Sequence, residues 1–137
     1  MVEKRREWSN VMTVDVNFNN ITLAVFTFSG RMIRLKRFGT PLREILTHRV
    51  RIERIRKRYL RSWRFIRGAR RTIERRGEKI RNIEWDYAHK IGDRTAGLAN
   101  EHNSTIFLEN LNKLKNNVEK NKTFNEKLSL WFYGRIL

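Results

Sequence analysis

The 137-residue chain contains no cysteine and a single proline. Without cysteine it forms no disulfide and offers no thiolate to a metal, and this composition predicts an intracellular, cytoplasmic protein. The three histidines, His48, His89 and His102, lack the spacing of a zinc site, so no zinc is expected. No apolar run approaches the ~18 residues that a membrane span requires. The N-terminus also lacks the apolar core of a signal peptide, so no membrane association is expected.

Acidic residues are scarce, with 14 Asp and Glu against 31 Lys and Arg, for a net charge of +17. Residues 31–81 hold 20 of these cations and four acids, so they carry a net charge of +16. Such a block predicts DNA or RNA, or both, as the partner, with an anionic membrane as the weaker alternative. The hydrophobic content of 39% is sufficient for one domain with a core of its own.

The segment 10–37 has the pattern of three short strands. Val11–Val16 and Ile21–Phe28 are rich in β-branched and aromatic residues, and Asn17–Asn20 supplies turn-forming residues between them. Ser29-Gly30 predicts a tight turn before a third strand, Arg31–Lys36, in which apolar and basic residues alternate. The pattern predicts a three-stranded antiparallel meander.

Helical periodicity begins at Leu42 and predicts a basic antiparallel helical hairpin over residues 41–103. Thr40 is the expected N-cap of the first helix, and Pro41 its first residue. Gly77 lies where a helix would end, which places the turn of the hairpin at residues 76–78. An apolar heptad stripe runs up to that point through Ile45, Ile52, Tyr59, Ile66 and Ile73.

A fourth strand is expected at residues 105–109, buried on both faces because residues 105–108 are almost wholly apolar. Residues 112–123 are polar and predict a loop, and residues 124–137 predict a terminal amphipathic helix. The predicted fold class is therefore mixed α/β. It consists of a three-stranded antiparallel meander and a fourth strand, with the long helical hairpin inserted between them in one domain over residues 1–137.

The most informative feature is a pair of acids, Asp15 and Glu109, in two apolar strand segments 94 positions apart. A carboxylate among apolar neighbours is costly unless a cation lies beside it. Two carboxylates on adjacent strands are a common way for a nuclease to hold a divalent metal against a phosphate. We therefore predict Asp15 and Glu109 as catalytic residues and metal ligands. The alternative for each is a structural acid that pairs with a nearby arginine or caps a turn.

Three segments resemble the TnpB (OrfB) transposon-associated proteins. Residues 14–24, Val-Asp-Val-Asn-Phe-Asn-Asn-Ile-Thr-Leu-Ala, resemble the first RuvC motif of that family, and residues 106–111, Ile-Phe-Leu-Glu-Asn-Leu, resemble the second. Residues 124–131 resemble the stretch that follows, so the resemblance extends over residues 10–137. It implies a partial ribonuclease H-like (RuvC) fold and a lineage of RNA-guided DNA endonucleases. In that family three carboxylates bind two Mg²⁺ ions.

The departures from the family pattern concern catalysis. The third catalytic Asp and a Cys-x-x-Cys zinc ribbon follow, in that family, the point at which this sequence ends. The resemblance thus implies a central fragment, from a truncated reading frame or a shortened protein, in which Asp15 and Glu109 form an incomplete set. Such a pair would hold Mg²⁺ or Mn²⁺ weakly and would not be catalytically competent alone. An intact nuclease would need Asp93, Glu101 or a carboxylate of a second chain.

The basic hairpin predicts a track for nucleic-acid phosphates, because its arginines outnumber the acids that could neutralise them. Trp63 and Phe65 could stack on bases there, although packing across the hairpin is the favoured interpretation. The alternative for the cations is a solvated helix face, extended by Arg51, Arg58 and Arg76. The predicted nucleic-acid-binding residues are Arg49, Arg54, Arg56, Lys57, Arg61, Arg64, Arg67, Arg70, Arg71 and Arg75.

Two further interpretations follow from the pattern. The first is a function of another class, a non-enzymatic basic coiled-coil module that binds nucleic acid or a partner protein. The second is self-association: without a fifth strand the fourth is an exposed apolar edge, and the heptad stripe offers another surface. Both features predict a homo-oligomer, most simply a dimer.

Overall fold

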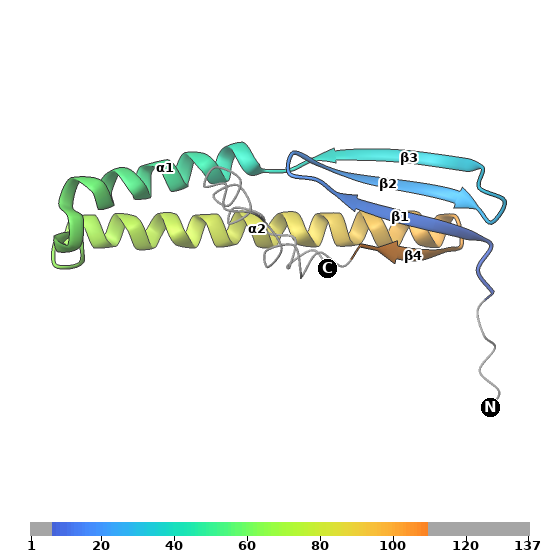
Figure 1. Cartoon of the computed structure of the whole chain (residues 1–137). Helices are drawn as coiled ribbons and strands as arrows, with labels where there is room; N and C mark the ends of the chain where they lie inside the picture. The colour runs from blue at the N-terminus through green and yellow to red at the C-terminus, as the bar shows by residue number, and fades with distance from the viewer. Residues whose placement is uncertain (1–6, 110–137) are drawn as a thin grey trace, which may run out of the picture.

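The structure is a computed structural model that describes residues 7–109. It is a mixed α/β fold with a four-stranded sheet and two long helices, as predicted (Figure 1). The predicted loop over 112–123 and terminal helix over 124–137 lie outside the described residues. In chain order the elements are β1 (Asn10–Val16), β2 (Asn20–Thr27), β3 (Met32–Gly39), α1 (Leu42–Tyr59), the 3-10 turn η1 (Leu60–Arg64), α2 (Arg67–Glu101) and β4 (Ser104–Leu108).

The sheet has the strand order β3-β2-β1-β4. The antiparallel meander predicted over 10–37 is confirmed, because β2 pairs antiparallel with both β1 and β3. Gly30 adopts a φ of +89° in the β2–β3 turn, a conformation that costs glycine little. β4 pairs with β1 in parallel, and the long helical hairpin makes the crossover between them.

The core of the sheet lies on the face that α2 covers. Alternate residues of β1 are buried, starting from Met12, and Ile21, Leu23 and Val25 of β2 are fully inaccessible. The C-terminal half of α2 contributes Ile91 and other apolar side chains to the same cluster. Figure 1 shows why α2 serves two purposes: one half lies against the sheet and the other half pairs with α1.

The turn of the hairpin lies at Leu60–Ile66, so the predicted turn at residues 76–78 is wrong. α1 has 18 residues and α2 has 35, corresponding to about 27 and 52 Å, so the second helix is the longer one. Gly77 lies inside α2. The seven-residue periodicity extends across the true turn, so it could not locate the turn.

The heptad stripe is used inside the hairpin. Ile45 and Ile52 of α1 pack against Ile73 and Ile80 of α2 in a second apolar cluster, which Tyr87 connects to the sheet core. The prediction that this stripe is free for self-association is therefore wrong. The prediction of an oligomer now depends on β4 alone.

β4 is an outermost strand of the sheet that the described residues form. The prediction that it is buried on both faces is wrong for residues 7–109, because Ile106, Phe107 and Leu108 are 41–59% exposed. α2 covers one face of this sheet near Ser104, which is buried, and leaves the outer end of the strand accessible.

The ends of the helices show how the chain changes direction. Thr40 does not cap α1: its hydroxyl donates to the Phe18 carbonyl at 2.8 Å, and Pro41 occupies the N-cap position. At the other end of the hairpin crossover, Asn103 takes a φ of +44° just after α2, a role that asparagine tolerates. Its side-chain amide donates to the Glu7 carbonyl and the Ser9 hydroxyl, which fixes the entry into β4.

Candidate functional site

The parallel pairing of β1 and β4 brings the two predicted carboxylates to neighbouring positions. Val14 lies opposite Leu108 in the ladder, so the next positions along the two strands are Asp15 and Glu109. Adjacent strands lie about 4.8 Å apart, and residues in register share a face of the sheet. Both side chains are exposed. The fold therefore presents two carboxylates from one short stretch of sheet surface.

Asp15 projects from the face of the sheet that is opposite to α2. Its strand neighbours Val14 and Val16 are buried in the core, whereas Asp15 is exposed. In the register it lies beside Thr22 of β2, which in turn lies beside Arg37 of β3. This row puts one cation on the same face as Asp15, two strands away.

The contacts of Asp15 distinguish between its structural alternatives. None of the ion pairs within residues 7–109 includes Asp15, so the described residues give no support to pairing with an arginine. The turn alternative has some support, because the Asn17 side-chain amide donates to Asp15 Oδ2 at 2.7 Å. A carboxylate that accepts one such bond keeps lone pairs for another ligand.

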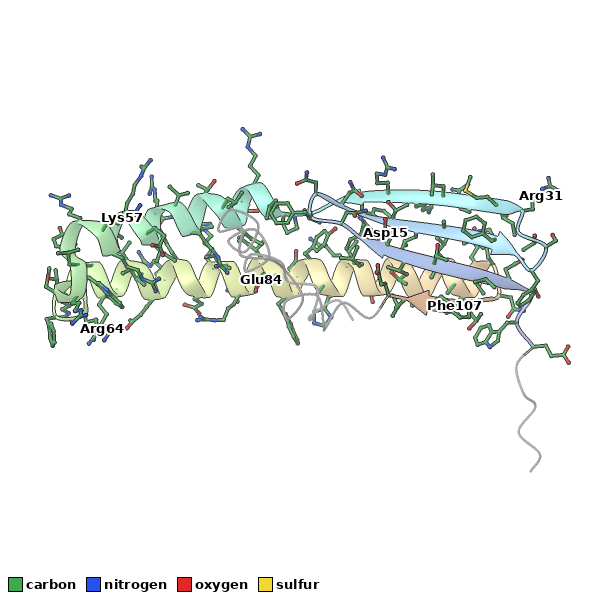
Figure 2. All side chains as sticks on the ribbon, in the orientation of Figure 1. Asp15, Arg31, Lys57, Arg64, Glu84 and Phe107 are labelled. Atoms are coloured by element: carbon green, nitrogen blue, oxygen red, sulfur yellow. The ribbon has the colours of Figure 1, made fainter. Side chains whose placement is uncertain are left out.

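The direction of the strands places the carboxylates relative to the hairpin. Both β1 and β4 point toward the end of the sheet from which α1 leaves (Figure 1). Asp15 lies in that half of the sheet, on the side of Lys57 and Arg64 (Figure 2). A ligand extended along the hairpin would therefore run toward the carboxylates.

The candidate metal ligands number two in the part of the chain that the structure describes. No group of three or more His, Cys, Asp or Glu side chains there could hold a metal ion. Neither Asp93 nor Glu101 thus joins Asp15 and Glu109. Carboxylate oxygens are the ligands that Mg²⁺ and Mn²⁺ prefer, and Mg²⁺ usually combines one or two of them with water and phosphate oxygens. The pair fits a divalent cation whose shell is completed by other groups.

The hairpin carries a long segment without acids. Residues 54–73 contain nine Lys and Arg and no Asp or Glu. Two of these cations pair with acids outside the segment, Arg56 with Glu53 at 3.1 Å and Arg70 with Glu74 at 3.4 Å. The other seven make no ion pair with any residue between 7 and 109. This uncompensated charge surrounds the turn between α1 and α2.

The predicted nucleic-acid-binding residues all lie on this hairpin. Nine of the ten are exposed, and the exception is Arg49, which is partly buried. Arg49 lines a groove of about 270 Å³ between the helices together with Arg56 and Arg81. The track is therefore formed by two helices rather than by one face of a single helix.

Sequence reasoning missed an acid in this groove. Glu84 also lines it and is 8% exposed, and Figure 2 shows it on α2 near the middle of the molecule. A buried carboxylate needs nearby cations, which Arg49, Arg56 and Arg81 provide in the lining. Its heptad-like position within a hydrophobic stripe was the signal that could have identified it.

A second contact joins the helices close to this groove. Arg76 Nη1 lies 2.9 Å from His48 Nδ1, and because a guanidinium only donates, the imidazole nitrogen accepts. His89 instead meets the edge of Trp85, with ring centroids 4.7 Å apart. Both histidines thus have structural contacts, and no metal cluster includes them within the described residues.

The two aromatic residues of the predicted track differ in their environment. Trp63 is partly buried and packs against the hairpin cluster, so the prediction of packing is confirmed for it. Phe65 is 89% exposed, so the same prediction is wrong for Phe65. No helix between residues 7 and 109 combines the length and apolar character needed to cross a membrane.

One comparison with known proteins gives a relative. A TnpB-like protein of Methanocaldococcus jannaschii is 26% identical to this chain over 134 residues. The alignment covers 96% of this chain and 47% of that protein, so the chain spans about half the length of the curated relative that it matches. No family model matches the sequence, and no solved structure gives a significant match. The distant similarity supports a relationship to the TnpB-like proteins and a transposase-associated role at the level of the family.

Proposed function

We propose that this chain is the central part of a TnpB-like, RuvC-type nuclease, in which the hairpin binds nucleic acid. In this proposal Asp15 and Glu109 are two of the carboxylates of its divalent-metal site. The observation that carries it is the register of β1 and β4, which puts these two acids side by side at the ends of adjacent parallel strands. A purely structural role would not require both acids to be exposed on the same face.

The strand order supports the RuvC part of the proposal. A ribonuclease H-like sheet begins with an antiparallel meander whose first strand also pairs in parallel with the fourth. The order β3-β2-β1-β4 and the parallel β1–β4 pair follow that arrangement. The similarity to a TnpB-like protein over 96% of the chain supports the same assignment.

The chain's own residues would divide the work between two surfaces. Asp15 and Glu109 would hold Mg²⁺ or Mn²⁺, which supplies charge for a phosphate and an activated water. The hairpin cations would hold the nucleic-acid backbone through contacts with phosphates, without regard to base sequence. Because the described residues offer two carboxylates, the chain alone would bind nucleic acid without cleaving it.

Binding is tested by fluorescence anisotropy of labelled single-stranded DNA, duplex DNA and RNA over a range of salt concentrations. Affinity should fall steeply with salt, by about 0.7 in log K per log unit of salt for each phosphate contact to a single strand. Reducing the charge at Arg54, Arg61 and Arg71 with glutamine should lower both the affinity and the slope. Equal substitution of Arg31 and Arg34, which lie near the far end of the sheet, is the matched control.

Catalysis is tested on the same substrates with Mg²⁺ or Mn²⁺ and an Asp15→Ala variant. Binding without cleavage is the expected result. Cleavage that Asp15→Ala abolishes would contradict the incomplete site and would show that the chain or its oligomer completes it. Absence of binding to all three nucleic acids would contradict the proposal as a whole.

A second candidate function is a basic module that binds nucleic acid without any descent from catalysis. The acid-free segment 54–73 favours it, because this segment would bind phosphates whatever the role of Asp15. Metal binding separates the two candidates. The module needs no divalent cation at Asp15 and Glu109, whereas the nuclease fragment does.

A further inference from the structure

The turn of the hairpin presents apolar side chains to solvent. Phe65 is 89% exposed, Leu60 is 74% exposed and Ile66 is 37% exposed. The turn lies at the opposite end of the molecule from the β2–β3 turn (Figure 1). Large exposed apolar groups at such a protruding end are costly in water and mark a contact with something else.

The position of Phe65 is fixed by the turn around it. Its backbone N–H donates to the Ser62 carbonyl at 3.0 Å, and the next N–H, that of Ile66, donates to the Trp63 carbonyl at 3.3 Å. Trp63 anchors the turn in the hairpin cluster, and the guanidinium groups of Arg56 and Arg64 lie 5.6 and 5.5 Å from its ring centroid. A side chain held in place on a fixed turn loses little entropy when it binds.

Backbone strain at the turn points in the same direction. Leu60 has a φ of +47°, a conformation that costs a residue with a Cβ more than glycine. Its side chain gains little from burial, since it is 74% exposed. A glycine would relieve the strain, so the retained apolar side chain is consistent with use in a contact.

Cations surround these apolar groups. Arg58, Arg61, Arg64 and Arg67 are all exposed, and none makes an ion pair with a residue between 7 and 109. Figure 2 shows Arg64 at the outer end of the hairpin. An exposed aromatic ring within a cluster of arginines is a typical arrangement for a stacked base whose flanking phosphates are neutralised.

We propose that Phe65 stacks on an unpaired base of the nucleic acid, while Arg61, Arg64 and Arg67 contact the adjacent phosphates. This inference rests on the proposed function and assigns a contact mode to the end of the hairpin. It predicts a preference for single strands, or for duplexes with an unpaired base, over a fully paired duplex.

An anionic membrane is the competing partner for an apolar turn with arginines around it. Only the end of the hairpin would touch such a surface, whereas α1 extends about 27 Å from it. Exposed cations continue along that length to Arg54 on α1 and Arg75 on α2. A polyanion that runs along the hairpin uses both the turn and these cations, so nucleic acid is the better fit.

The experiment uses the whole chain and a short single-stranded oligonucleotide that contains 2-aminopurine, whose fluorescence is quenched by stacking. Phe65→Ala should weaken binding at least about 5-fold, the lower limit for the loss of one stacked base, and should change the 2-aminopurine signal. Phe65→Tyr keeps an aromatic ring and should restore both. The matched control is Phe28→Ala, which removes a 67% exposed phenylalanine from the β2–β3 turn and should change neither.

Each outcome decides the inference. Unchanged binding and signal in Phe65→Ala would overturn stacking and leave the proposed function standing. No binding by the unmodified chain would overturn both. Binding to phosphatidylserine vesicles that Phe65→Ala abolishes, with binding to the oligonucleotide unaffected, would overturn the inference in favour of a membrane contact. Circular dichroism of the exposed-site variants checks that the fold is retained.

Discussion

Two arginines near the hairpin turn should affect stability in opposite directions when each is replaced by glutamine. Arg67 begins α2, whose first turn contains no acid, and Arg56 lies in the last turn of α1. The helix dipole disfavours a cation at the first position and favours one at the second. Arginine and glutamine have similar helix propensities, so the substitution changes mainly charge.

The magnitudes follow from the neighbours of each residue. Arg67 has Arg70 and Arg71 three and four positions on, and each like-charge pair destabilises a helix by about 0.2–0.5 kcal/mol. The dipole adds about 0.3–1 kcal/mol at low salt. Arg67→Gln should therefore stabilise the fold by about 1 kcal/mol. Arg56→Gln loses the ion pair with Glu53 and a cation–π contact with Trp63, and should destabilise it by about 1 kcal/mol.

The assay is urea unfolding of both variants at low salt and near 1 M salt, with nucleic-acid binding measured in parallel. At high salt the gain from Arg67→Gln should largely disappear, because the Debye length falls to about 3 Å. The same variant should bind oligonucleotides more weakly, which would mean that Arg67 is kept at a cost to stability. A loss of stability in Arg67→Gln at low salt would refute the electrostatic reasoning.

Three further predictions test the fold. Gly77→Ala should stabilise the protein by about 0.5–1 kcal/mol in urea unfolding, because the new Cβ meets only Arg81 Nη1 at 3.7 Å within α2; destabilisation would indicate a helix end there. Ile91→Ala should destabilise it by about 2–5 kcal/mol, since this side chain is 1% exposed, and a loss below about 1 kcal/mol would contradict the packing of α2 on the sheet. Burial raises the pKa of Tyr87 above its usual 10.0, and the charge of Arg94 opposes this less strongly. The folded state thus holds the proton more tightly, so stability should fall above pH 10 in the unmodified chain relative to Tyr87→Phe, as measured by unfolding at several pH values, and parallel curves would refute it.

The strands could be predicted because their signals are local. β-branched residues in Val11–Val16 and Ile21–Phe28, with turn formers between them, determine β1 and β2 almost residue by residue. The parallel partner of β1 is a non-local choice, and the residues alone do not specify it. Resemblance to a family suggested that partner, and the β1–β4 register then put Asp15 beside Glu109.

The turn of the hairpin could not be predicted because its chemistry is unusual. It contains neither glycine nor proline before Gly68, and Leu60 adopts a conformation that the sequence does not favour. Gly77 was the more typical helix end, yet tertiary packing of Ile73 and Ile80 against α1 keeps α2 continuous through it. Tertiary contacts therefore overrode the local signal.

The same limit applied to the side chains inside the hairpin. Glu84 is polar, so its place in a hydrophobic stripe suggested exposure on a helix surface, whereas the paired helices bury it. The contact between His48 and Arg76 spans 28 positions and depends on where the turn lies. The exposed cations needed no such knowledge, because a segment with nine cations and no acid cannot neutralise itself in any packing.

The central claim is that Asp15 and Glu109 share one divalent cation beside a nucleic-acid-binding hairpin. The measurement that tests it most directly is Mn²⁺-induced broadening of backbone amide signals in the NMR spectrum of the whole chain, with bound oligonucleotide. We expect selective broadening around Asp15 in β1 and around Glu109 after β4, and its loss in Asp15→Ala. Broadening spread over other acids, or unchanged in Asp15→Ala, would contradict the claim.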